Sequence, residues 1–167
     1  MKKSNYSKGY SIIELLVYIA LFVLISLVVV KSLIYMMKTY SDARSFRTVQ
    51  QNGELVMERL TREIRQANTV SVAGSAFGSS PGTLSLSGKD NSNAPYTAVA
   101  SLVNGVAQLT INGVSSSLSS DEVSISNLTF WNITTATSNA IKLQLTLTTT
   151  NAPVVTKSFY TTVVLRE

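Results

Sequence analysis

The first pattern along the chain is an apolar run near the N-terminus. Residues 12–30 are interrupted only by Glu14 and Ser26. As a helix rising 1.5 Å per residue, such a run spans about 28 Å, close to the thickness of a bilayer core. A cleaved signal peptide has a shorter apolar core, of about 7–15 residues, and a small-residue cleavage site after it, which Val30 followed by Lys31 does not supply. The pattern therefore predicts a retained membrane anchor.

After this run the apolar positions form a single stripe with steps of three and four residues, as on one face of a helix. The stripe consists of Phe46, Val49, Gly53, Val56, Met57, Leu60, Ile64 and Ala67. No proline occurs before Pro81, and Asn68 is a suitable stop. We therefore expect one helix over residues 11–68, apolar all round in its first half and amphipathic in its second.

Two features of the amphipathic half are expected to modulate its stability. Glu58 with Arg62, and Arg59 with Glu63, are acid–base pairs four residues apart, and we place both pairs on faces away from the apolar stripe. Gly53 is a weak point, because glycine in a helix interior costs about 1 kcal/mol relative to alanine.

Residues 69–167 have a different pattern, rich in Ser, Thr, Asn and β-branched residues. The dipeptides Asn104-Gly105 and Asn112-Gly113 favour tight two-residue hairpin turns, and together they predict a three-stranded meander over residues 97–118. A short strand is expected at residues 83–87, within an otherwise loop-like segment.

Alternation of apolar and polar residues predicts further strands toward the C-terminus. It is regular over residues 141–147 and 159–165, whereas residues 123–125 and 128–130 are out of phase, which indicates a bulge near Asn127. The predicted fold class is α+β: a long N-terminal helix packs its stripe on one face of a C-terminal antiparallel β-sheet, and the opposite face is polar. We divide the chain into a basic leader (1–9), a membrane half (10–31) and an amphipathic half (32–68) of the helix, and a β-sheet head (69–167).

Charge and composition restrict the chemistry of the chain. The formal net charge is +5, but it resides in the leader and the helix, because residues 69–167 hold four basic and four acidic residues. This balance does not indicate nucleic-acid binding. Cysteine and histidine are both absent, so we expect no disulfide, no metal site and no cofactor. The adjacent acids Asp121 and Glu122 are interpreted as a turn or strand start, and no enzyme activity is predicted.

A short motif precedes the apolar run. Residues 8–14 read Lys-Gly-Tyr-Ser-Ile-Ile-Glu, after a leader that also carries Lys2 and Lys3. This arrangement resembles the class III signal of type IV prepilins and pseudopilins. The resemblance implies that a membrane aspartyl prepilin peptidase cuts between Gly9 and Tyr10 and N-methylates Tyr10. The family most often has phenylalanine after the cut, and tyrosine keeps its aromatic ring. The expected fold is accordingly pilin-like.

The resemblance also implies an assembly role for Glu14. An ionised carboxylate at the edge of hydrocarbon costs several kcal/mol unless it is paired. In a filament, Glu14 is expected to neutralise the amino group on Tyr10 of a neighbouring subunit, which favours one axial register. Alternatively, Glu14 reaches the lipid head groups or is protonated.

A second segment narrows the resemblance. Residues 57–67 read Met-Glu-Arg-Leu-Thr-Arg-Glu-Ile-Arg-Gln-Ala, which is similar to J-type minor pseudopilins of type II secretion and to W-type minor pilins. This implies a structural minor subunit near a filament tip. Its implied partners are prepilin peptidase, other pilin or pseudopilin subunits, the inner-membrane assembly platform and membrane lipid. The leader lysines place the N-terminus in the cytoplasm and the head outside a bacterial inner membrane.

Several functions stay open at this stage. A type II secretion pseudopilus, a type IV pilus and a competence pseudopilus all fit the pattern, although the neutral head disfavours direct DNA capture. A different class is a signal-anchored binding module that recognises a glycan or a peptide and never polymerises. An anchored enzyme has little support, because a Ser/His/Asp set is impossible without histidine.

Overall fold

The computed structural model describes residues 11–89, 93–134 and 138–165. Two units divide the chain, Met1–Ser41 and Asp42–Glu167. The single helix of the described residues, α1 (Ile12–Gln66), contributes to both units. It begins directly after Ser11, whose carbonyl oxygen accepts hydrogen bonds from the main-chain N–H groups of Glu14 (3.0 Å) and Leu15 (3.2 Å). The predicted helix over residues 11–68 is confirmed, with its C-terminal end two residues earlier.

The part of α1 in the first unit has apolar side chains on all sides. Every large hydrophobic residue from Ile12 to Tyr40 is at least half exposed. By length and composition, α1 is able to cross a membrane in this part of the chain. Exposure of so much apolar surface to water is unfavourable, so this surface calls for cover by lipid or by other apolar surfaces.

The part of α1 in the second unit has the predicted one-sided pattern. Its buried positions are Val49, Gly53, Val56, Leu60, Glu63 and Ile64, followed by Ala67 just after the helix. Two members of the predicted stripe differ, because Met57 is only partly buried and Phe46 is half exposed. Phe46 instead packs its ring under Lys157, whose Nζ lies 4.7 Å from the ring centroid.

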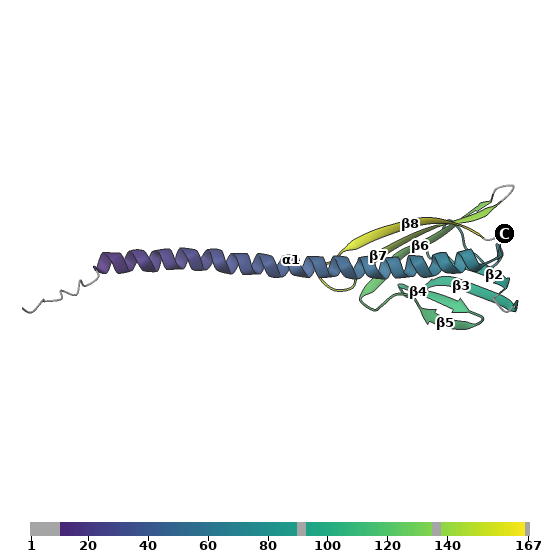
Figure 1. Ribbon diagram of the computed structural model, residues 1–167, viewed down its shortest axis with the longest axis horizontal. Helices are drawn as coiled ribbons and strands as arrows, with labels where there is room; N and C mark the ends of the chain where they lie inside the picture. Colours follow the sequence, from purple (N-terminus) through teal and green to yellow (C-terminus); the bar gives the residue numbers. More distant parts are fainter. Residues whose placement is uncertain (1–10, 90–92, 135–137, 166–167) are drawn as a thin grey trace, which may run out of the picture. The chain divides into compact units, whose positions relative to one another are not determined.

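The strands form two antiparallel sheets rather than the single sheet that we expected. The first has the order β1-β2-β3-β4-β5 and the second the order β6-β7-β8 (Figure 1). Their bounds are β1 Thr69–Val70, β2 Leu84–Lys89, β3 Pro95–Val103, β4 Val106–Ile111, β5 Val114–Ser117, β6 Val123–Thr134, β7 Asn139–Thr149 and β8 Thr156–Val164. The predicted α+β class, with a long helix packed on antiparallel β-structure, is confirmed.

The local predictions for the strands also agree with the structure. Asn104, Gly105, Asn112 and Gly113 all have positive φ, between 48° and 87°, as the two predicted hairpin turns require. Pairing of β6 with β7 changes register between Ile125 and Asn127, where a bulge was expected. Asp121 and Glu122 lie in the turn before β6.

The division into two sheets results from the partners of β6. One edge of β6 pairs with β7, and its other edge meets a loop: Gly78 and Gly82 donate main-chain hydrogen bonds to the carbonyl oxygens of Phe130 and Leu128, each at 2.8 Å. A Cβ atom at Gly82 would lie 2.8 Å from the Leu128 oxygen, so the loop approaches this closely only with glycine. The loop thereby occupies the edge that would otherwise accept another strand.

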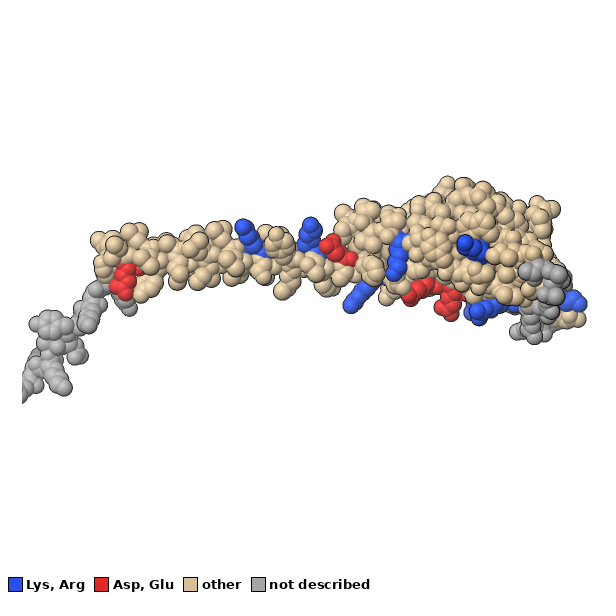
Figure 2. All heavy atoms as spheres, turned by 90° about the horizontal axis from the view of Figure 1, so that it is seen from above, with Lys and Arg blue, Asp and Glu red and all other residues tan. Residues whose placement is uncertain are grey.

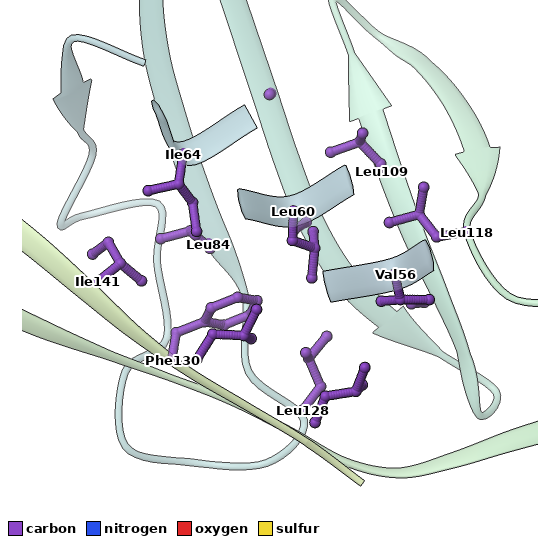
Figure 3. Packing of buried hydrophobic residues seen from close by; sticks show 14 of the residues in the cluster. Val56, Leu60, Ile64, Leu84, Leu109, Leu118, Leu128, Phe130 and Ile141 are labelled. Atoms are coloured by element: carbon purple, nitrogen blue, oxygen red, sulfur yellow. The ribbon is translucent and has the colours of Figure 1, made fainter. Parts of the chain in front are cut away.

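The core joins the helix stripe to both sheets. In Figure 3, Val56, Leu60 and Ile64 of the helix lie between Leu109 of the first sheet on one side and Ile141, Phe130 and Leu128 of the second sheet on the other, with Leu84 of the first sheet next to Ile64. All eight side chains are at most 1% exposed. Burial of this kind contributes about 1.5–3 kcal/mol for each large apolar side chain, which fixes the helix against both sheets.

Candidate functional site

The processing motif lies at the N-terminal limit of the described chain. Gly9 and Tyr10, the residues of the expected cleavage point, lie outside the described residues. Ser11 is exposed and directly precedes the first turn of α1. The assembly residue of the motif, Glu14, is in that first turn, where the positive end of the helix dipole favours a carboxylate.

Glu14 has a hydrogen-bond partner that the sequence analysis missed. The hydroxyl of Tyr18 donates a hydrogen bond to Glu14 Oε1 at 3.1 Å. The two residues are one helical turn apart, so the i,i+4 spacing of a tyrosine after a glutamate was the available signal. Among the residues that the structure describes, no other group bonds the Glu14 carboxylate, whose Oε2 can accept a hydrogen bond or meet a cation.

The surroundings of Glu14 are otherwise uncharged along the helix. The next charged residue toward the C-terminus is Lys31. In Figure 2 a tan stretch of helix accordingly separates the first acidic side chain from the next basic one. A carboxylate in such apolar surroundings is costly when it is ionised and unpaired, so the position calls for a cationic or proton-donating partner.

The second unit contains a buried acid that the sequence analysis placed wrongly. Glu63 was expected on an exposed face, but it is only 3% exposed. The hydroxyl of Tyr96 on β3 donates a hydrogen bond to its Oε2, and Arg59 Nε lies 3.3 Å from its Oε1. The steps from Val56 to Leu60, Glu63 and Ala67 are four, three and four residues, so the apolar stripe itself contained the signal.

Burial determines the acidity of this group. Loss of hydration raises the pKa of Glu63 above its usual value of 4.5, and the nearby charge of Arg62 opposes that rise. Glu63 therefore connects α1 to β3 through a hydrogen bond inside the core, at a cost in desolvation.

The second unit also has a groove of about 290 Å³ beside α1. Its lining comes from the exposed side of the helix and from the end of β5 and the residue after it: Leu55, Glu58, Arg59, Arg62, Ser117 and Leu118. Leu55 is 57% exposed, whereas Leu118 is nearly buried. The groove thus combines apolar walls with two guanidinium groups and one carboxylate. The sequence analysis did not predict it.

Within residues 11–89, 93–134 and 138–165, no three acidic, histidine or cysteine side chains come together as a possible metal site. No protein-family model, no curated protein and no solved structure matches the chain. The fold and the site define an α+β protein whose N-terminal helix is long and apolar enough to serve as a single-pass anchor.

Proposed function

We propose that this chain is a structural minor subunit of a type IV pilin-like filament, either a type II secretion pseudopilus or a type IV pilus. The observation that carries the proposal is one acid, Glu14, in the first turn of α1 and within an otherwise uncharged apolar run over residues 12–30, five residues after Gly9. The subunit acts without catalysis, at or near the filament tip. The motif in residues 57–67 supports a minor rather than a major subunit.

The physical role of Glu14 in this function is charge neutralisation during assembly. Cleavage after Gly9 creates an ammonium group on Tyr10, and Glu14 follows one turn later. When apolar helices pack side by side, the Glu14 carboxylate accepts a hydrogen bond from the amino group of a neighbouring subunit. Breaking a buried ion pair costs about 3–5 kcal/mol, so one axial register is strongly preferred over others.

The proposed location follows from the leader and the helix. The helix spans the bacterial inner membrane once, the leader lysines hold the N-terminus in the cytoplasm, and the head is extracytoplasmic. The partners of this proposal are prepilin peptidase, other pilin or pseudopilin subunits, the inner-membrane assembly platform and lipid.

Mass spectrometry of the protein recovered from native membranes tests this function. We expect a mature chain that begins at N-methylated Tyr10. A Gly9→Val variant is expected to accumulate as the uncut precursor, whereas the control Ser7→Val, which changes the leader away from the cut, is processed normally. An intact chain beginning at Met1, in cells with active prepilin peptidase, contradicts the proposal.

A second candidate is a signal-anchored extracytoplasmic binding module that does not polymerise. The groove lined by Leu55, Arg62 and Leu118 favours it, because a concave surface with apolar walls and guanidinium groups is suited to a ligand. The Gly9→Val variant separates the candidates, since a plain anchor retains its location and binding when that glycine is changed.

A further inference from the structure

The outer edge of the first sheet is open beside the groove. β5 is the last strand of the order β1-β2-β3-β4-β5, and all four of its residues are exposed. An edge strand presents unpaired main-chain groups to which another extended chain can add. Because Ser117 ends β5 and also lines the groove, the edge and the groove are continuous.

Pairing with β4 shows which main-chain groups of β5 face outward. Gln108 pairs with Ser117 and Ile111 with Val114, and the N–H of Leu118 donates to the Ala107 oxygen at 2.8 Å. Since hydrogen-bonded and non-hydrogen-bonded positions alternate in an antiparallel pair, Ser115 and Ser117 direct their main-chain N–H and C=O groups away from β4. These two residues offer up to four hydrogen bonds to an added strand.

The arginines of the groove differ in their pairing. Arg59 uses Nε for the buried Glu63 carboxylate at 3.3 Å, which leaves its two terminal amino groups for another acceptor. In the described part of the chain, Arg62 makes no ion pair within 4.0 Å, although Glu58 lines the same groove. Arg62 therefore has a full set of donors for a bidentate carboxylate.

A second copy of this chain does not match these features through its own β5. Residues 114–117 read Val-Ser-Ser-Ser and carry no acid. Pairing of β5 with β5 would leave Arg62 without a carboxylate and the groove without a large apolar side chain.

We propose that β5 and the adjacent groove bind an extended segment of another polypeptide, which adds to the sheet at Ser115 and Ser117. The segment places a large apolar side chain between Leu55 and Leu118, and a carboxylate two residues away on Arg62. Residues i and i+2 of a strand point to the same face, so both side chains enter the groove together. This inference concerns the second unit alone and holds whether or not the chain assembles into a filament.

The test uses the full chain in detergent micelles and fluorescein-labelled octapeptides of alternating threonine and valine. One peptide has a central Leu-Thr-Glu and the other a central Leu-Thr-Lys. By fluorescence anisotropy, we expect the glutamate peptide to bind about tenfold more tightly, as one good charge-assisted contact gives. Arg62→Glu is expected to reverse this preference, whereas Arg65→Glu, an exposed helix residue that does not line the groove, leaves it unchanged.

The main-chain hydrogen bonds between β5 and the added strand are tested by changing the peptide, so that the protein itself is not altered. The glutamate peptide is N-methylated at alternate residues along one edge, and a second version is methylated along the other edge. We expect one version to lose binding and the other to keep it, because only one edge of an added strand meets β5.

Four results would overturn the proposal. They are no binding of either peptide at about 1 mM, equal affinity for both peptides, a preference that survives Arg62→Glu, and full binding of both methylated versions.

A Ser115→Cys variant tests whether a second copy of this chain occupies the edge of β5 instead, because the chain has no other cysteine. A disulfide-linked dimer that forms rapidly on mild oxidation, and that excess glutamate peptide does not prevent, would assign the edge to a second copy.

Discussion

Replacement of Gly53 by alanine tests how the helix packs on β8. A Cβ atom at this position would lie 2.2 Å from Cε2, 2.3 Å from Cζ and 2.9 Å from Cδ2 of Phe159. Ordinary carbon contacts are about 3.5–4.0 Å, so the ring must move by more than about 1 Å. The ring of Phe159 also lies near Lys157, whose Nζ is 5.5 Å from the centroid of the Phe159 ring. The same Nζ donates a hydrogen bond to Gln50 Oε1 on α1. Phe159 is partly buried and packs against the core, so a displacement of its ring disturbs neighbouring contacts.

The expected effect follows from two opposing contributions. Alanine in place of glycine favours the helix by about 1 kcal/mol. Overpacking of this kind costs about 1–3 kcal/mol. We expect Gly53→Ala to lower the free energy of unfolding by about 1 kcal/mol. In a Phe159→Ala background the clash is absent, so the same substitution should raise the free energy of unfolding by about 1 kcal/mol, which gives a coupling of about 2 kcal/mol.

Urea unfolding in detergent micelles measures this coupling. Trp131 on β6 is the only tryptophan, so its fluorescence reports on the second sheet. Gln51→Ala is the matched control, because Gln51 is exposed on the same helix and should have the same small effect in both backgrounds. If Gly53→Ala stabilises the protein equally with and without Phe159, the reasoning about the ring contact is refuted.

Two further predictions concern the acidic residues. Glu63 has a raised folded-state pKa, so the folded protein binds more protons than the unfolded chain above pH 4.5. Its contribution to stability is therefore greatest at low pH and declines as the pH rises from 4.5 through the folded-state pKa. Urea unfolding between pH 4 and 7 should show a steeper decline for the wild type than for Glu63→Gln, and identical slopes would disprove the shift. Glu14→Gln should leave cleavage before Tyr10 intact but lower incorporation into filaments at least about tenfold, since a buried charge loses its partner. Tyr18→Phe, which removes only the 3.1 Å hydrogen bond, should have a smaller effect in the same assay.

Features set by neighbouring residues were predictable from the sequence. The stripe of apolar residues indicated where α1 buries a face, because residues three and four apart share one side of a helix. The dipeptides Asn104-Gly105 and Asn112-Gly113 indicated two hairpin turns, since both turn positions need positive φ. The phase change near Asn127 indicated the bulge in β6. The proposed role of Glu14 also rests on the sequence, because one acid in an apolar run is recognisable without any tertiary contact.

Features that depend on contacts between distant residues were not predictable in this way. Alternation indicated strands but not their partners, and a loop with Gly78 and Gly82 covers one edge of β6, so the strands form two sheets. Gly53 was expected to be a weak point, whereas its missing side chain makes room for Phe159 on the last strand.

The same distinction explains Glu63, whose charge suggested an exposed position. Burial of a charged group depends on a partner elsewhere in the chain, and Tyr96 supplies that partner from β3. The sequence by itself therefore determined the helix, its apolar first half, the turns and the strand segments, because these depend on residues a few positions apart. Only the tertiary structure decided the division into two sheets, the burial of Glu63 and the groove beside β5, because these depend on which distant segments come together.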